Sequence, residues 1–545
     1  MNRQNHNTKF LVILLFFILI LSSAACIFQS RTQPTVTPTI SNPTNTIQPS
    51  ATSTIAPSKT ATKLPTPTVL GDPSTSNREI TPSLPTRTLS PQNSALPTMA
   101  LPTPTSALPT LTLRPLNPNP PFLGIEIAGK SDLEPVEESG VYWVRRNGVK
   151  WHEIEPTEGR RDWRVLSDLG IELQSISEQN QEVILVVRGT PEWAQQVPGY
   201  YCGPIKEDKL EAYGDFISEL VTRYSRPPYN VKFWELGNEP DVDPALVIPD
   251  MVFGCWGDPD DDYFGGEYYA EMLKVVYPII KEADPDAKVI IGGLLLDCDP
   301  ENPPESQSGS GEYKDCNSSK YLEGILENDG GDYFDGVSYH AYDYYYQSMG
   351  HYGNINWHSS WSSTGPVLIA KGNFIREILE EYGYTDKFLV NSEMGLICGT
   401  TGGEDYCKTE AFQKSKANYV PQAHAAAKAE GLLANIWYSM RGWRASGIVS
   451  KNDSPYPAYT AIQFAVEQFE DVDYVGEVSD YPGIMGYEFE RGDGYFWVVW
   501  ALDDDSHSVN LPDPPSAVYD AVGDELEAEE TITITLEPLY IEWIP

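Results

Sequence analysis

Short apolar runs alternate with segments of helical periodicity along residues 122–470, and this alternation limits the possible folds more than any other feature of the chain. Each run is nearly continuous in apolar residues, as is typical of parallel strands that are buried on both faces. There are eight such runs. Eight strands joined by crossover helices predict a closed (β/α)8 barrel of the α/β class. The runs cover residues 122–127, 141–146, 183–188, 231–236, 288–293, 334–340, 387–393 and 432–438.

The segment between the third and fourth runs shows the helical pattern most clearly. Apolar residues recur there at steps of three and four, which predicts an amphipathic helix with one buried stripe. The stripe consists of Leu210, Tyr213, Phe216, Ile217, Leu220, Val221 and Tyr224. Long loops follow the third, fourth, fifth and seventh runs. Such loops build the carboxyl-end face of a barrel, so any chemistry is expected there.

The pattern changes after about residue 471, where apolar residues alternate with polar ones. Met485, Tyr487 and Phe489 follow this period of two, and Asp493-Gly494 offers a hairpin turn. A small, sandwich-like antiparallel β domain is expected over residues 472–545, after a barrel over residues 119–471.

The N-terminal region has the composition of an exported, tethered protein. An apolar stretch of twelve residues follows Arg3 and Lys9, which predicts a signal peptide over residues 1–26. Small residues before Cys26 resemble a bacterial lipoprotein signal, although Ser23 stands where an aliphatic residue is usual, so release from the membrane is the alternative. Residues 31–118 contain no aromatic residue, and 48 of these 88 residues are Pro, Thr or Ser. Residues 27–118 are therefore expected to form a disordered linker.

The net charge of the chain limits the classes of partner that it can bind. The chain carries 37 basic and 78 acidic side chains, a net charge of −41. Residues 119–545 hold 29 of the basic and 76 of the acidic ones, so the predicted folded part has a net charge of 29 − 76 = −47. A field of this sign repels nucleic acid and anionic lipid, and it disfavours polyuronates. A membrane contact is expected only through a lipid on Cys26.

Six cysteines remain besides Cys26, and an even number in an exported chain predicts three disulfides. Fifteen connectivities are possible. Proximity in Gly/Asp/Asn-rich stretches favours two local pairs and leaves one longer pair, namely Cys298 with Cys316, Cys398 with Cys407, and Cys202 with Cys255.

Two carboxylates stand where the predicted strands end. Glu239 follows the fourth run within Asn238-Glu239-Pro240, and Glu393 ends the seventh run. Strands four and seven lie across the lumen of a closed barrel, so the two groups could flank one bond. Two carboxyl groups about 5–5.5 Å apart suit retaining glycoside hydrolysis. The alternatives are a solvated carboxylate for Glu239 and, for Glu393, a role taken instead by Glu377, Glu380 or Glu381 on the preceding helix.

Here the sequence resembles the superfamily of retaining β-glycosidases with the (β/α)8 barrel, glycoside hydrolase clan A, over roughly residues 120–470. Its signature is Asn-Glu-Pro after strand four and a nucleophilic Glu after strand seven. Weaker matches lie at residues 143–145, 190–194 and 338–342. The barrel followed by a β domain is most similar to the β-xylosidase/α-L-iduronidase family 39, and next to the cellulase-like family 5. Met394 and Gly237 depart from the usual pattern.

The resemblance implies roles for seven side chains. Glu239 would be the acid/base, Glu393 the nucleophile, and Asn238 the partner of the sugar 2-hydroxyl. Trp437 would form the sugar platform. The charge and orientation of the nucleophile would be held by Arg145, His340 and Tyr342. Only the resemblance selects Arg145 over Arg146, and buried structural roles are the alternative for His340 and Tyr342.

The sequence thus predicts an exported, monomeric glycoside hydrolase that acts on carbohydrate. No cofactor or metal is expected, since the seven histidines are scattered without the spacing of a metal site. The alternative from another class is a barrel that binds surface glycans without cleaving them.

Overall fold

The structure is a computed structural model that describes residues 117, 120–248, 253–303, 315–346, 356–399 and 405–544. The predicted signal peptide, Cys26 and all of the predicted linker except Asn117 lie outside the described residues. Within the described ranges, no helix has both the length and the apolar composition that a membrane span requires.

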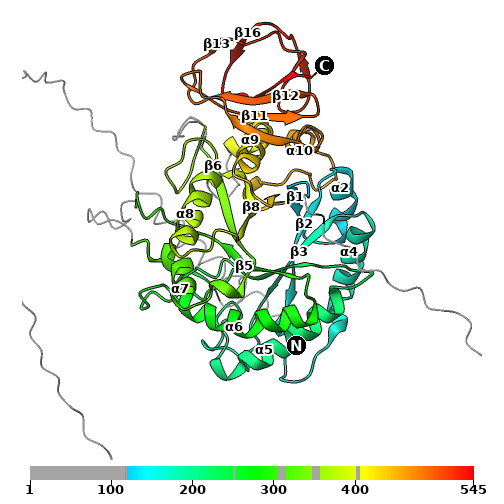
Figure 1. The fold of residues 1–545 in the computed structure, drawn as a ribbon. Helices are drawn as coiled ribbons and strands as arrows, with labels where there is room; N and C mark the ends of the chain where they lie inside the picture. Colours follow the sequence, from blue (N-terminus) through cyan, green and yellow to red (C-terminus); the bar gives the residue numbers. More distant parts are fainter. Residues whose placement is uncertain are drawn as a thin grey trace, which may run out of the picture. The chain divides into compact units, whose positions relative to one another are not determined.

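Eight parallel strands form a closed barrel, as predicted (Figure 1). Neighbouring strands pair in the order β5, β4, β3, β2, β1, β9, β8, β6, and a further pairing of β5 with β6 closes the ring. The short β7 (Trp357–His358) pairs antiparallel with the end of β6. The barrel strands are β1 (Leu123–Glu126), β2 (Trp143–Lys150), β3 (Glu182–Arg188), β4 (Phe233–Asn238), β5 (Lys288–Leu294), β6 (Gly336–Tyr345), β8 (Phe388–Cys398) and β9 (Ala434–Trp437).

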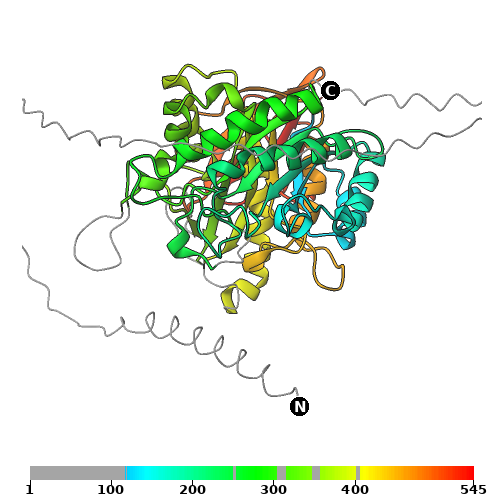
Figure 2. The same ribbon diagram turned by 90° about the horizontal axis from the view of Figure 1, so that it is seen from below.

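Helices on the outside of the barrel connect the strands. The stripe predicted between the third and fourth strands forms α5, and all seven of its residues are buried. Helices α5 and α6 contact each other and lie at the bottom of Figure 1, and Figure 2 shows the molecule from that side. The α-helices are α2 (Leu133–Glu138), α3 (Trp151–Ile154), α4 (Ser167–Glu178), α5 (Leu210–Tyr224), α6 (Gly266–Ala283), α7 (Tyr321–Glu327), α8 (Leu368–Glu381), α9 (Glu410–Ala429) and α10 (Pro457–Gln468).

The interior of the barrel is layered, with apolar residues below and charged residues above. The apolar floor includes Trp143 of β2 and Phe233 of β4, together with Ile184, Ile290, Val390, Ala434 and Ile436. Side chains of a strand alternate between its faces, so positions two residues further on also point inward. These positions are Arg145 and Glu235, and both are fully buried. The chemistry of the barrel therefore begins one layer above its apolar floor.

The C-terminal region forms antiparallel sheets, as predicted. One sheet has the strand order β10, β11, β12, β17, β14, β15, and β13 pairs with β16. The β11–β12 turn differs from the prediction by one residue, because Arg491 pairs with Gly494 and the loop is Gly492-Asp493. Gly492 takes a φ of 62°, which glycine adopts without steric cost. The strands are β10 (Asp473–Glu477), β11 (Ile484–Arg491), β12 (Gly494–Ala501), β13 (His507–Asn510), β14 (Ala517–Tyr519), β15 (Glu525–Leu526), β16 (Thr531–Ile534) and β17 (Leu539–Trp543).

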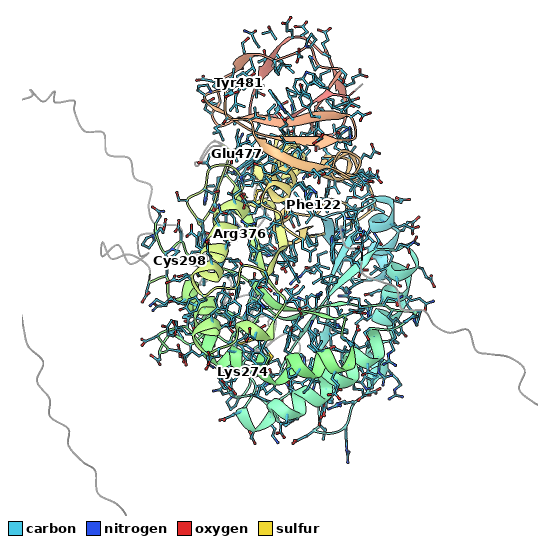
Figure 3. All side chains as sticks on the ribbon, in the orientation of Figure 1. Phe122, Lys274, Cys298, Arg376, Glu477 and Tyr481 are labelled. Carbon is cyan, nitrogen blue, oxygen red and sulfur yellow. A yellow bond between two sulfur atoms is a disulfide. The ribbon has the colours of Figure 1, made fainter. Side chains whose placement is uncertain are left out.

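Aromatic side chains connect the barrel to this sheet. Phe122, labelled in Figure 3, lies just before β1 and packs edge-on against Phe469 at 5.6 Å between ring centroids. Phe469 in turn contacts Phe489 of β11 and Tyr540 of β17, at 5.2 and 6.4 Å. One apolar core therefore runs from the start of the barrel into the C-terminal sheet.

The three predicted disulfides are present. They join Cys202 to Cys255, Cys298 to Cys316 and Cys398 to Cys407. These cysteines lie beyond the carboxyl ends of β3, β4, β5 and β8 or, for Cys398, on the last residue of β8. The disulfides therefore fix loops on the face where the sequence predicts the chemistry.

Candidate active site

A β-bulge turns Glu393 into the barrel. Along β6 and β8, Tyr339 pairs with Asn391 but His340 pairs with Glu393, so Ser392 is the extra residue. Val390 belongs to the inward-facing floor, and strict alternation would then point residue 393 outward. The extra residue shifts the alternation by one position, which is the usual effect of a bulge near a functional site.

A kinked backbone places Glu239 at the end of β4. Gly237 has a φ of 103° and Glu239 a φ of 51°. The left-handed region is uncommon for a residue with a side chain, and it costs roughly 1–3 kcal/mol. The amide of Glu239 donates to Gly293 O of β5 at 2.8 Å, which holds the kink. The glycine at position 237, a departure from the usual family pattern, is thus explained by a conformation that a bulky residue would resist.

Glu239 and Glu393 meet across the lumen. One oxygen of each carboxylate and one ring nitrogen of His340 all lie within 4.8 Å of one another. Both glutamates are buried, with relative exposures of 3% and 6%. The pair is therefore shielded from bulk water and close enough for both groups to act on one bond.

Arg145 is the centre of the charge network. Its Nη1 lies 2.5 Å from Glu393 Oε1 and also donates to Glu126. Its Nε and Nη2 donate to the two oxygens of Glu235, at 2.9 and 2.8 Å. Arg146 instead points outward, to Glu172 of α4 at 2.6 Å. The structure thus places Arg145, not Arg146, against the candidate nucleophile.

Glu126 and Glu235 were missed by the sequence analysis. Each is a lone carboxylate within a buried apolar run, and Glu235 is fully buried. Glu235 also accepts from Gly293 N at 2.9 Å. An acidic residue in a buried strand needs a polar or cationic partner, so the sequence signals that such a partner exists but does not say which residue it is.

Tyr342, Asn238 and His340 lie around the two carboxylates. The Tyr342 hydroxyl donates to Glu393 Oε2 at 2.5 Å. Asn238 Oδ1 accepts from Arg145 Nη2 at 2.7 Å, which leaves its Nδ2 as the group able to donate to a substrate. His340 Nδ1 lies 2.7 Å from Glu239 Oε1 and 3.4 Å from Glu393 Oε2. His340 therefore pairs mainly with the acid/base candidate rather than with the nucleophile.

Burial and neighbouring charges shift the pKa values of Glu239, Glu393 and His340 to different extents. Burial, followed by the charge of Glu393, holds the pKa of Glu239 well above its usual range. Burial also raises the pKa of Glu393, but Arg145 and the Tyr342 hydrogen bond act in the opposite direction. Burial, together with the positive charges of Arg145 and Lys371, holds the pKa of His340 well below its usual value, so the ring is neutral. The cluster favours a protonated Glu239 beside an ionised Glu393.

The same three groups have the spacing of a metal site, because Glu239, His340 and Glu393 each offer one ligand atom. The surroundings fit a cation poorly. Arg145 already donates to one oxygen of Glu393 at 2.5 Å, and Tyr342 donates to the other. A divalent ion would lie next to this guanidinium and would repel it.

The prediction for Trp437 does not agree with its burial. Its side chain is 0% exposed, and its Nε1 donates to Ser446 O at 3.1 Å. A fully buried ring cannot serve as a sugar platform in this conformation. Nearby, Trp443 is 53% exposed and its ring meets Tyr342 edge-on, at 6.4 Å between centroids. Trp443 was also missed, since it lies in a loop whose path the sequence does not indicate.

Comparisons with known proteins agree on the fold. No protein-family model matches the sequence. No curated protein matches it in sequence either. A family 39 glycoside hydrolase from Bacteroides cellulosilyticus WH2 is similar in structure, with a TM-score of 0.56 and 15% identity, over 78% of this chain and 81% of that one. A conserved exported protein from Bacteroides fragilis has a TM-score of 0.53 and 12% identity, over 78% of this chain and 97% of that one. At these identities the likeness establishes the shared barrel, and the first neighbour belongs to the family that the motifs resemble.

Proposed function

We propose that this protein is a retaining glycoside hydrolase with Glu239 as acid/base and Glu393 as nucleophile. The observation that supports it most is the pair of buried carboxylates whose oxygens lie within 4.8 Å of each other, one directly after β4 and the other at the bulge within β8. Retaining enzymes need two carboxyl groups about 5–5.5 Å apart, whereas inverting enzymes need about 6.5–9.5 Å to admit a water molecule. The structural likeness to a family 39 glycoside hydrolase supports the same reaction class.

The environments of the two groups suit two different steps. Glu393, held by Arg145 and Tyr342, attacks the anomeric carbon as a carboxylate and forms a glycosyl ester. Glu239, whose pKa lies well above its usual range because of burial, gives its proton to the leaving oxygen. The resulting Glu239 carboxylate then takes a proton from water, which attacks the anomeric carbon and frees Glu393 with the configuration retained.

Two substitutions and one product analysis test this proposal, after a screen of chromogenic glycosides has identified a substrate. Glu393→Gln should lose at least ~10⁴-fold in kcat, since no covalent intermediate forms. Glu239→Ala should lose ~10²–10⁴-fold on poor leaving groups but keep turnover of nitrophenyl glycosides, whose departure needs little protonation. Glu477→Gln is the matched control, because Glu477 is exposed on β10 and should keep full activity.

NMR of the first product should show the anomeric configuration of the substrate. An inverted product, or full activity in Glu393→Gln, would rule out the mechanism. A barrel that only binds glycans is the second candidate. It predicts glycan binding with no turnover in the wild-type protein and no difference in turnover between wild type and Glu393→Gln.

We further propose that the protein is exported and held by a lipid on Cys26. Three disulfides support export, because such bonds persist in oxidising compartments. Cys26→Ser should move the protein from the detergent phase to the aqueous phase in phase partitioning. Unchanged partitioning would reject the anchor.

A further inference from the structure

A loop beyond β9, next to the candidate active site, carries an exposed aromatic ring and a cation that has no ion-pair partner among the described residues. It includes Trp443, Arg444 and Ala445. Arg444 and Ala445 take φ angles of 47° and 61°, in the left-handed region. Two consecutive residues with side chains rarely adopt this conformation, so their surroundings must hold it.

Buried donors from the barrel hold this loop from below. Lys416 of α9 is fully buried, and its Nζ donates to Ala445 O at 2.9 Å and to Gly447 O at 2.6 Å. Trp437 of β9 donates to the carbonyl between them, Ser446 O, at 3.1 Å. Three consecutive backbone carbonyls are thus bound by side chains of the barrel. The loop is pre-organised, as a binding site requires.

Trp443 offers a flat apolar surface beside the catalytic carboxylates. Its side chain is 53% exposed, and its ring contacts the ring of Tyr342, whose hydroxyl donates to Glu393. Exposed indole rings in such places stack on sugar rings, because the apolar face of a pyranose matches the ring in area.

The Arg444 guanidinium packs against aromatic rings but forms no ion pair with a carboxylate of the described residues. Its guanidinium carbon lies 5.0 Å from the Tyr344 ring centroid and 5.1 Å from that of Trp443. Its Nε is buried and has no hydrogen-bond partner. Among the described residues, no carboxylate forms an ion pair with it, although the chain carries 78 acidic side chains. A half-buried guanidinium with open donors is a group suited to a planar or tetrahedral anion.

We propose that Trp443 and Arg444 form a subsite for a sugar that bears an acidic substituent, with the ring on Trp443 and a carboxylate or sulfate on Arg444. This rests on the proposed glycosidase function and names its substrate class. The net charge of −41 disfavours a densely charged polyuronate. A sparsely substituted acidic glycan fits both the single local cation and the acidic surroundings.

The test compares pairs of oligosaccharides that differ only in the charged group. One pair consists of an oligosaccharide with one uronic acid and its carboxyl-reduced product. The other pair consists of a monosulfated oligosaccharide and its desulfated product. Wild-type protein, Arg444→Gln and Arg444→Lys are compared by KM and kcat on each pair. Arg226→Gln is the matched control, because Arg226 is exposed in the loop between α5 and β4.

Wild type should show a KM about 10- to 100-fold lower for the acidic member of at least one pair, the range expected of a charge-assisted hydrogen-bonded contact. Arg444→Gln should remove that difference, because KM rises much more for the acidic member than for the neutral one. Arg444→Lys should keep part of the KM difference, since lysine retains the positive charge but not the two parallel N–H donors of the guanidinium. The pair that responds identifies carboxylate or sulfate as the ligand.

Several outcomes would overturn the inference. Equal losses on acidic and neutral members would mean that Arg444 only braces the Trp443 ring. Equal KM values for both members in wild type would mean that no anion is bound. In either case, turnover that depends on Glu393 would leave the proposed function standing. No turnover of any glycan by wild type would reject both proposals.

Discussion

At the scale of single residues, the candidate site depends on how one arginine serves several carboxylates. Arg145 contacts Glu126, Glu235 and Glu393, and all four groups are buried. One guanidinium cannot neutralise three carboxylates at a low dielectric constant, so at least one of them is expected to hold a proton. Burial raises the pKa of Glu126 from its usual value near 4.5 to about 8, which identifies it as the protonated member. Arg145 is then free to stabilise Glu393 as an anion.

This assignment predicts the pH dependence of stability for Glu126→Gln. The folded state holds a proton on Glu126 up to about pH 8, whereas the unfolded chain releases it near pH 4.5. Between these values Glu126 binds a proton in the folded state but not in the unfolded chain, so its contribution to the free energy of unfolding falls as pH rises. Gln does not titrate. The difference between the Tm of Glu126→Gln and the Tm of the wild type should therefore shift in favour of the variant as pH rises from 4.5 to 8.

Differential scanning calorimetry across this range measures the effect. Glu134→Gln, an exposed change on α2, is the control and should run parallel to the wild type. If the Tm of Glu126→Gln also changes with pH in parallel with that of the wild type, Glu126 is ionised at neutral pH and the charge assignment is wrong.

The sequence revealed some of these residues and not others, for physical reasons. Glu239 and Glu393 stand at predicted strand ends beside recognisable motifs, and Arg145 was selected by resemblance. Glu126 and Glu235 lie within strands, where an acidic residue gives no local signal of its partner. Trp437 was taken as a sugar platform because its motif matched, but its exposure depends on the loop that covers it. Burial of this kind is a tertiary property.

At the scale of elements, the strands were predictable because burial on both faces leaves a continuous apolar run. The bulge at Ser392 was not, since an extra residue in one strand is defined only by the partner strand. The hairpin at Gly492-Asp493 was placed one residue late for a similar reason. Two glycines flank Asp493, and only the pairing register of β11 with β12 determines which glycine belongs to the hairpin loop.

Helix α9 provides a prediction at this scale, through Lys416. Its Nζ is the donor to Ala445 O and Gly447 O, so Lys416→Met should leave both carbonyls without a partner. Each loss costs roughly 1–3 kcal/mol, partly offset because a buried ammonium is no longer desolvated. The loop that carries Trp443 should loosen. We expect a KM several-fold higher, a lower Tm, and a kcat within about twofold of wild type, because Glu239 and Glu393 lie on other strands.

Lys274→Met is the matched control, since Lys274, labelled in Figure 3, lies on α6 and pairs only with Glu271 in the described structure. Hydrogen exchange should show faster exchange at residues 443–447 in Lys416→Met alone. Unchanged exchange and KM would mean that the loop is held by other contacts.

At the scale of the whole molecule, the described body contains the complete barrel, the candidate site and the C-terminal sheet. The barrel begins at β1, where Phe122 packs against Phe469, and every side chain of the candidate site lies after this point. Residues 31–118 have no aromatic residue with which to extend the apolar core. The sequence therefore predicts the organisation of the body well, whereas the role of the preceding segment is open to experiment.

Removal of that segment is the last prediction. A chain that begins at Asn117 should fold, stay soluble, and keep the kcat, KM and Tm of the longer protein, if residues 27–118 are only a spacer. The opposite result, in which the segment affects KM, would also have a physical basis. Residues 1–118 carry 37 − 29 = 8 basic side chains, of which two lie in the predicted signal peptide, so residues 27–118 carry 8 − 2 = 6 basic and 78 − 76 = 2 acidic side chains, whereas residues 119–545 have a net charge of −47. An attraction between the two would be screened over about 8 Å at physiological salt. A spacer predicts equal KM for both chains at low and at physiological salt, whereas a KM that differs only at low salt would show that the basic segment contacts the acidic body.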